Sequence, residues 1–170
     1  LLKFDTKKIP KWKIRNSNSL YISSFGKDLK LKIIDGGIVK DNEPNKLKKK
    51  LKKIIKSDID FFITSGAVSA GKYDFIPNFV KTFGFKEIFK GVQIKPGRPL
   101  MISKLNEKIF FGLPGNPISL AVGFRFFVYP LIRNILGIKK EKKFKAKLLN
   151  TYIKQKNFNH FLRCTMDVNK

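Results

Sequence analysis

Short apolar runs alternate with amphipathic segments along most of the chain. Apolar positions spaced three or four residues apart over residues 44–55 predict a helix whose other face is rich in lysine. The runs at 59–63 and 109–111 predict buried strands, and the long apolar segment 117–136 predicts a helix. We therefore predict an α/β fold with three layers, in which a mostly parallel sheet carries helices on both faces.

Further elements are predicted on either side of this pattern. Asn16, Ser17 or Asn18 can cap a helix that ends near Gly26, and residues 29–34 resemble a strand with lysines on its outer face. A helix is predicted from residue 74 to 83. Two further strand segments, 87–94 and 100–102, are expected on either side of a Pro-Gly loop.

The pattern changes after Gly137. A lysine-rich linker at 139–145 is followed by segments at 147–150 and 158–168 that resemble strands. We therefore predict two units, an α/β domain over residues 1–137 and the beginning of a small β domain over residues 138–170.

Three loops rich in glycine or proline each follow an apolar run. They read Thr-Ser-Gly-Ala-Val-Ser-Ala-Gly-Lys-Tyr-Asp at 64–74, Lys-Pro-Gly-Arg-Pro at 95–99, and Leu-Pro-Gly-Asn-Pro-Ile-Ser at 113–119. Such loops, placed after a strand and before a helix, form phosphate and oxyanion pockets in α/β proteins. The alternative is three ordinary surface turns. Their repetition within one stretch favours a single composite site for an anionic ligand.

Individual residues in these loops suit that chemistry. Gly66 allows the backbone to approach a ligand closely, and Val68 can pack inward. Lys95 and Arg98, three residues apart on a rigid turn, can point at a common tetrahedral oxyanion, or can be two solvated cations. Asp74 could cap the following helix, or bind Mg²⁺ together with a phosphate group.

The three loops, in this order and spacing, resemble the molybdopterin molybdenumtransferase family, which comprises the MoeA proteins and the corresponding domain of gephyrin. Upstream, Ile-Arg-Asn-Ser-Asn-Ser at 14–19 resembles the family's helix start, and Val-Lys-Asp at 39–41 resembles its acidic turn. The resemblance covers most of residues 14–137. It implies a fold like that of the MogA and MoaB proteins. Ala67, Lys72 and Gly91 depart from the commonest family residues.

The resemblance assigns roles to residues at matching positions. It implies catalytic roles for Asp41, Asp74, Lys95 and Arg98, with Asp74 also a metal ligand. It implies that the pterin nucleotide and its oxyanion are bound by Ser65, Gly66, Val68, Ser69, Gly71, Pro114, Gly115, Asn116, Pro117 and Ser119. The implied reaction inserts molybdate into adenylylated molybdopterin, with Mg²⁺, and releases AMP. Such a reaction requires positioning and charge neutralisation rather than a protein nucleophile.

The composition limits the kinds of partner that we expect this chain to bind. The net charge of +25 would attract nucleic acid, yet only five of the 37 basic residues are arginine and the lysines are scattered along the chain. We expect no nucleic-acid partner. The apolar segment 118–136 is interrupted by Arg125 and Arg133, so we expect no membrane span either. The single cysteine, Cys164, excludes an internal disulfide and fits a reducing compartment, and we expect a cytoplasmic protein.

Two further expectations concern the assembly. The segment 117–136 is apolar on nearly all sides, so it is either buried within its own domain or partly covered by a second subunit, and the resemblance implies a homodimer of the full-length protein. Relative to the family, the chain lacks a first strand with its Gly-Asp-Glu loop, two N-terminal domains, and most of the β domain. We therefore expect a fragment or a split gene product. The alternative function is a non-catalytic pterin-binding, nucleotide-binding or oligomerisation module.

Overall fold

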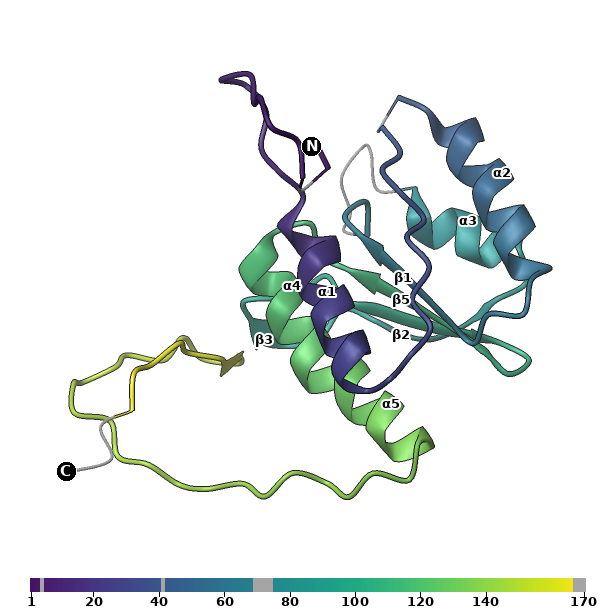
Figure 1. The fold of residues 1–170 in the computed structure, drawn as a ribbon. Helices are drawn as coiled ribbons and strands as arrows, with labels where there is room; N and C mark the ends of the chain where they lie inside the picture. The colour runs from purple at the N-terminus through teal and green to yellow at the C-terminus, as the bar shows by residue number, and fades with distance from the viewer. Residues whose placement is uncertain (4, 41, 69–74, 167–170) are drawn as a thin grey trace.

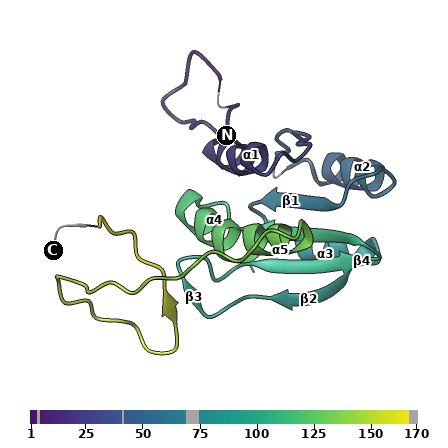
Figure 2. The same cartoon turned by 60° about the horizontal axis from the view of Figure 1, so that its bottom comes forward.

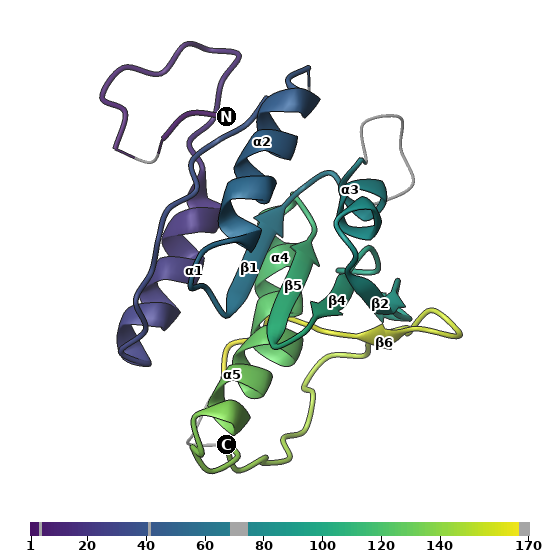
Figure 3. The same cartoon turned by 90° about the vertical axis from the view of Figure 1, so that its right-hand side faces the viewer.

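A four-stranded sheet forms the centre of the molecule. The computed structural model describes the chain except for residues 4, 41, 69–74 and 167–170. The strands lie in the order β1 (Phe61–Ser65), β5 (Lys108–Leu113), β4 (Met101–Leu105) and β2 (Lys86–Lys90) (Figure 3). β1 and β5 are parallel, whereas the other two pairs are antiparallel. The α/β class is thus confirmed, but the described sheet is mixed rather than mostly parallel.

The mixed sheet has a local cause. A two-residue turn joins β4 to β5, and its first residue, Asn106, has a φ of 51°. Asparagine tolerates this left-handed conformation better than most residues, and so short a connection can only join antiparallel strands. The alternation of apolar runs showed where the strands are but carried little information about their direction.

One face of the sheet is covered by α1 (Ser17–Asp28) and by a long helix in three consecutive segments. These are α4 (Pro117–Gly123), the π-helical η1 (Phe124–Val128) and α5 (Tyr129–Ile135) (Figure 1). Together they enclose the larger core cluster, whose buried members are Leu100, Ile102, Phe111, Leu113, Leu120, Phe124, Val128, Tyr129 and Ile132. The predicted helix over 117–136 is therefore confirmed as a core helix of this domain.

The same helix is the one segment, among the described residues, that is long and apolar enough to cross a membrane by length and composition. Core helices of globular domains satisfy those criteria too. Every fourth residue from Leu120 to Ile132 is buried against the sheet, which is the packing of a core helix.

The opposite face is covered by α2 (Pro44–Ile55) and α3 (Ile76–Thr82). A second core cluster lies between these helices and the sheet, and its buried members are Leu51, Phe62, Val68, Ile76, Val80, Phe85, Met101 and Phe110. Because side chains alternate across a strand, Phe110 faces this cluster while Phe111 faces the other. Helices thus lie on both sides of the sheet, as predicted, and Pro44 begins its helix, as its preformed φ favours.

Residues 29–34 do not form the predicted strand. Leu29 and Leu31 pack against the larger core cluster, and Ile33 lies so close to Gly26 that a Cβ on Gly26 would clash with it. The alternating apolar residues therefore pack beside α1 instead of pairing with a strand. Gly26 lies within α1, which continues to Asp28.

The chain after α5 carries little regular structure. In the described part, β6 (Asn159–His160) pairs in parallel with β3 (Ile94–Lys95), and no strand forms at 147–150. Leu148 and Leu149 are exposed there and have no strand to pair with in the described residues. Figure 2 shows this segment leaving the α/β body and returning to it at β6. The small β domain stays a prediction.

Candidate functional site

The first and third loops meet at one edge of the sheet. Because β1 and β5 are parallel, their carboxyl ends coincide, with Ser65 opposite Leu113. The Gly66 amide donates a hydrogen bond to the Leu113 carbonyl oxygen at 2.8 Å. A Cβ on Gly115 would lie 3.5 Å from the Cα of Gly66. The two loops are therefore in direct backbone contact, which glycine at both positions permits.

Val68 anchors the first loop in the core. Its side chain is only 3% exposed and lies over Gly112 of β5, where an added Cβ would come within 2.8 Å of Val68 Cγ1. The predicted inward packing of Val68 is confirmed. A ligand can therefore meet this residue only through its backbone.

The third loop opens the long helix. Pro114 is buried, whereas Gly115, Asn116 and Pro117 are exposed. The Asn116 side-chain oxygen accepts hydrogen bonds from the amides of Ile118 and Ser119, at 3.0 and 3.1 Å, so Asn116 is the N-cap. Ser119, half-buried, lies in the first helical turn, where the helix dipole favours an anion.

The second loop lies against that same turn. Gly97 is buried with a φ of 113°, and a Cβ there would lie 3.3 Å from the Ser119 carbonyl oxygen. The carbonyl oxygen of Arg98 accepts hydrogen bonds from the amides of Val92 and Leu100, which fixes the loop backbone, while the Arg98 side chain is exposed. All three predicted loops are therefore brought together, the first and second both touching the third loop or its helix.

The ammonium group of Lys95 has a partner that the sequence did not suggest. Lys95 Nζ donates to Gln155 Oε1 at 3.1 Å, and β6 runs beside Lys95 through backbone hydrogen bonds. Gln155 lies 60 residues away in a segment without regular structure, so no local pattern could have identified it.

Four predicted site residues lie outside the described residues, namely Asp41, Ser69, Gly71 and Asp74. Their roles, including the metal role of Asp74, stay predictions. Among the described residues no group of three or more His, Cys, Asp or Glu side chains could hold a metal ion. The described part of the site thus offers lysine, arginine, hydroxyl and backbone donors, a set that suits an anion and does not by itself fit Mg²⁺.

Asn18 is a site residue that the sequence pattern suggested only as a helix cap. The cap is Asn16, whose side chain accepts from the amides of Asn18 and Ser19. Asn18 is only 5% exposed, and its Nδ2 donates to the Gly115 carbonyl oxygen at 2.9 Å. Figure 1 shows the first turns of α1 and α4 at the same end of the molecule. The signal that could have revealed Asn18 is a second asparagine just inside the helix start.

An open groove of about 510 Å³ lies beside the start of α4. Tyr21 of α1, Arg125 of η1 and Arg163 of the C-terminal segment contribute to its lining. Its volume is within the range of small-molecule sites. Burial raises the pKa of the Tyr21 hydroxyl above its ordinary value, and the positive charge of Arg125 partly opposes this.

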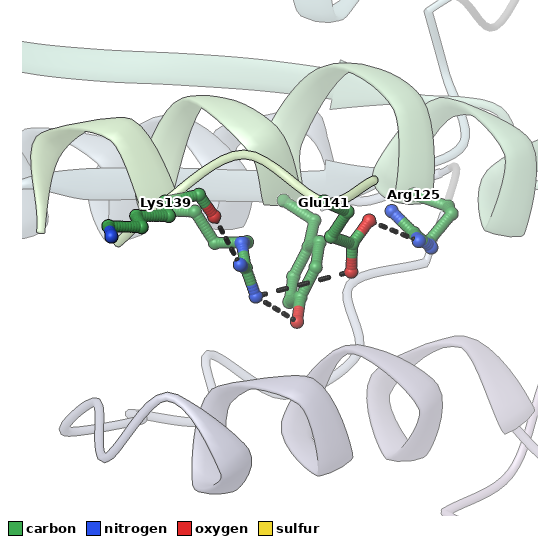
Figure 4. Close-up of polar contacts among 5 residues, drawn as sticks. Arg125, Lys139 and Glu141 are labelled. Atoms are coloured by element: carbon green, nitrogen blue, oxygen red, sulfur yellow. Dashed lines mark hydrogen bonds and ion pairs between the residues drawn. The ribbon is translucent and has the colours of Figure 1, made fainter. Parts of the chain in front are cut away.

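Glu141 holds Arg125 at the side of this groove. Its carboxylate pairs with Arg125 and lies 4.0 Å from Arg133 (Figure 4). Both guanidinium groups also lie over the Tyr129 ring, at 5.2 and 5.5 Å from its centre. These contacts tie the start of the C-terminal segment to the long helix.

Comparison with known families agrees with this geometry. A family model described as "Probable molybdopterin binding domain" matches residues 5–134. Proteins named molybdopterin molybdenumtransferase from Nostoc sp. and Haemophilus influenzae are 36% and 37% identical to the chain over 130 residues. These alignments cover 75% and 76% of this chain but 29% and 31% of those proteins. One from Staphylococcus epidermidis is 30% identical over 93% of this chain and 38% of its own length. The chain spans about a third of the length of these relatives.

Solved structures show the same fold. The molybdopterin biosynthesis MoeA protein from Pyrococcus horikosii superposes with a TM-score of 0.66 at 25% identity, covering 78% of this chain and 32% of that one. The molybdopterin biosynthesis enzyme MoaB from Thermus thermophilus superposes with a TM-score of 0.51 at 16% identity, covering 71% of this chain and 87% of that one, which supports the fold alone. The predicted resemblance is confirmed.

Proposed function

This chain belongs to the family of molybdopterin-binding domains, and from that premise we propose that it takes part in inserting molybdate into adenylylated molybdopterin, with release of AMP. The family and the names of the relatives support a place in molybdenum cofactor biosynthesis. The specific reaction is our inference. The single observation that supports it best is that the three predicted loops meet, the first and third at the carboxyl ends of β1 and β5 and the second against the first turn of α4.

In this proposal the described residues bind and orient a negatively charged substrate. The exposed side chains of Lys95 and Arg98 neutralise the tetrahedral oxyanion, molybdate or phosphate. Ser119 and the first turn of α4 supply a hydroxyl group and the positive end of a helix dipole. The close approach of Gly66 to Gly115 lets the ligand contact backbone donors of both loops.

Mg²⁺ would neutralise phosphate charge in this reaction, as the family resemblance implies. Its predicted ligand Asp74, like the predicted catalytic residue Asp41, lies outside the described residues, and the described part of the site does not fit the ion. We therefore assign no step to the metal. Positioning and charge neutralisation by the three loops account for the contribution of the described residues.

We also propose a homodimer and a cytoplasmic location. The long helix leaves Ile118 and Phe126 42% and 50% exposed, so two apolar side chains of this helix are available for a partner surface. Sedimentation velocity at micromolar concentration is the test for assembly, and we expect a species of twice the chain mass. A monomer under those conditions would contradict the dimer while leaving the enzymatic proposal intact.

The reaction itself is tested by incubating the protein with adenylylated molybdopterin, molybdate and Mg²⁺, and measuring AMP by chromatography. We expect AMP release that requires molybdate and saturates with it. Tight binding of the pterin nucleotide without AMP release would instead favour the non-catalytic binding module. Absence of binding at about 1 mM would exclude the pterin nucleotide as the ligand, because enzymes commonly have KM values between about 1 µM and 1 mM.

A further inference from the structure

Asn18 connects α1 directly to the third loop. It lies in the first turn of α1, and its Nδ2 donates to the carbonyl oxygen of Gly115, 97 residues further along. The Asn18 side chain is only 5% exposed, whereas Gly115 is exposed, so the hydrogen bond lies at the edge of the packed interior. Gly115 in turn lies against Gly66 of the first loop. A single side-chain amide therefore joins α1 to the point where the first and third loops touch.

This hydrogen bond fixes the direction of one peptide group. The peptide between Gly115 and Asn116 is trans, since the only cis bond found in the described chain precedes Pro96. In a planar trans peptide the carbonyl and the following N–H point in opposite directions. Because Asn18 holds the Gly115 carbonyl toward α1, the Asn116 N–H is directed away from α1. Gly115 and Asn116 are both exposed, so a ligand can reach this N–H.

The backbone N–H groups in the first turn of α4 either donate to the Asn116 side chain or are missing. Asn116 Oδ1 caps the amides of Ile118 and Ser119, and Pro117 has no N–H. The Asn116 N–H is the loop donor whose direction Asn18 sets, and it lies at the positive end of the helix dipole. Its direction decides whether it can contribute to binding.

We infer that Asn18 is a positioning residue for the anion site: it orients the Gly115–Asn116 peptide so that the Asn116 N–H donates to the bound oxyanion. This inference deepens the proposed function and rests on it for the identity of the ligand. The chemistry recognised is a tetrahedral oxyanion, either a phosphate group of the nucleotide or molybdate itself.

Stability alone does not account for this side chain. Asn18 Oδ1 is buried and has no hydrogen-bond partner among the described residues. An unpaired buried acceptor is unfavourable and offsets part of the stability that the hydrogen bond from Asn18 Nδ2 contributes. The net stability contributed by Asn18 is therefore small, and we assign to this side chain the orientation of the loop.

The test compares four forms of the full chain: wild type, Asn18→Leu, Asn18→Ala and Leu51→Ala. Each is titrated calorimetrically with AMP and, separately, with sodium molybdate, and its thermal unfolding is recorded. Leu51→Ala removes a buried side chain of α2 on the opposite face of the sheet, so it is the control for lost stability without a change at the site. A crystal structure of Asn18→Leu reports the peptide orientation independently of any ligand.

We expect both Asn18 variants to bind at least one probe about tenfold or more weakly, because a charge-assisted hydrogen bond is lost. Asn18→Leu removes the unpaired Oδ1 but also the donor to the Gly115 carbonyl, so its unfolding temperature should stay close to that of wild type, whereas Leu51→Ala should unfold earlier yet bind normally. The probe whose binding is weakened, AMP or molybdate, shows which oxyanion the Asn116 N–H contacts. If Asn18→Leu does not fold, Asn18→Ala, which also lacks the N–H donor and adds no charge beside the anion, is compared with wild type instead.

Wild-type affinity in both Asn18 variants would overturn the inference. If wild type binds neither probe, the proposed ligand is wrong, and the crystal structure then decides the positioning role. A Gly115–Asn116 peptide in the wild-type orientation would overturn that role, whereas a rotated peptide would support it.

Discussion

Gly97 of the second loop lies directly against Ser119 in the first turn of α4: a Cβ on Gly97 would come within 3.3 Å of the Ser119 carbonyl oxygen and 3.2 Å of Ile94 Cδ1. The contact joins the loop that carries Lys95 and Arg98 to the helix start that carries Ser119. Gly97 and Ser119 are about twenty residues apart in sequence.

Gly97→Ala should separate the second loop from α4. Gly97 has a φ of 113°, which side chains other than glycine rarely adopt, and the new methyl group would have to displace backbone. We expect a loss of about 1–3 kcal/mol in the free energy of unfolding, together with weaker oxyanion binding. Urea denaturation and molybdate titration measure the two effects. Gly36→Ala is the control, because a Cβ there meets nothing within 4 Å.

Lys95→Ala and Arg98→Ala should each lower cofactor formation at least about tenfold, because each removes a charge-assisted contact to the oxyanion. Both side chains are exposed, so the free energy of unfolding should change by only about 0–1 kcal/mol. Raising the molybdate concentration should partly restore activity if these residues hold molybdate. The assay is AMP release at limiting molybdate, alongside thermal unfolding.

Gln155→Ala is the matched control for Lys95. Lys95 Nζ donates to Gln155 Oε1. If the only role of Lys95 were this structural contact, Gln155→Ala would lower activity as much as Lys95→Ala does. We expect Gln155→Ala to retain activity. Normal turnover by the Lys95 and Arg98 variants would exclude oxyanion binding by this loop, and unfolding of both would show that the loop is structural.

The local chemistry of the site could be read from the sequence, because glycine, proline and asparagine report backbone conformation directly. The meeting of Gly66 with Gly115 follows from two adjacent parallel strands, and the cap at Asn116 follows from its position before Pro117. The direction of β4, the course of residues 29–34 and the Lys95–Gln155 contact could not be read in this way. Each depends on which distant surface a segment packs against, and apolar periodicity does not encode that.

Val68 and Gly112 should behave as a coupled pair. Gly112→Ala would place a Cβ 2.8 Å from Val68 Cγ1 and 3.4 Å from Met101 Cβ, so we expect overpacking to lower the free energy of unfolding by about 1–3 kcal/mol. Val68→Ala removes the clashing methyl groups. The double variant should therefore be more stable than the sum of the two single effects predicts, with a coupling of about 0.5–3 kcal/mol. Additive effects in urea denaturation would show that the two side chains do not share this space.

Tyr21 should make the protein sensitive to high pH. Burial raises the pKa of its hydroxyl above the ordinary value of 10.0, against the opposing charge of Arg125, so the folded state holds this proton more tightly than the unfolded state. The corresponding stability is fully present below about pH 10 and is lost as the pH rises through the folded pKa. Tyr21→Phe should therefore lose less stability above pH 10 than wild type does.

Removing the charge of Arg125 gives the second half of this test. Arg125→Met should raise the pKa of Tyr21 further, because the favourable interaction of the tyrosinate with the guanidinium disappears. Tyrosinate absorbance, taken as the difference between each protein and its Tyr21→Phe counterpart, isolates this one hydroxyl among the four tyrosines. A Tyr21 that titrates at its ordinary pKa, or whose pKa falls in Arg125→Met, would show that burial against α4 does not control its ionisation.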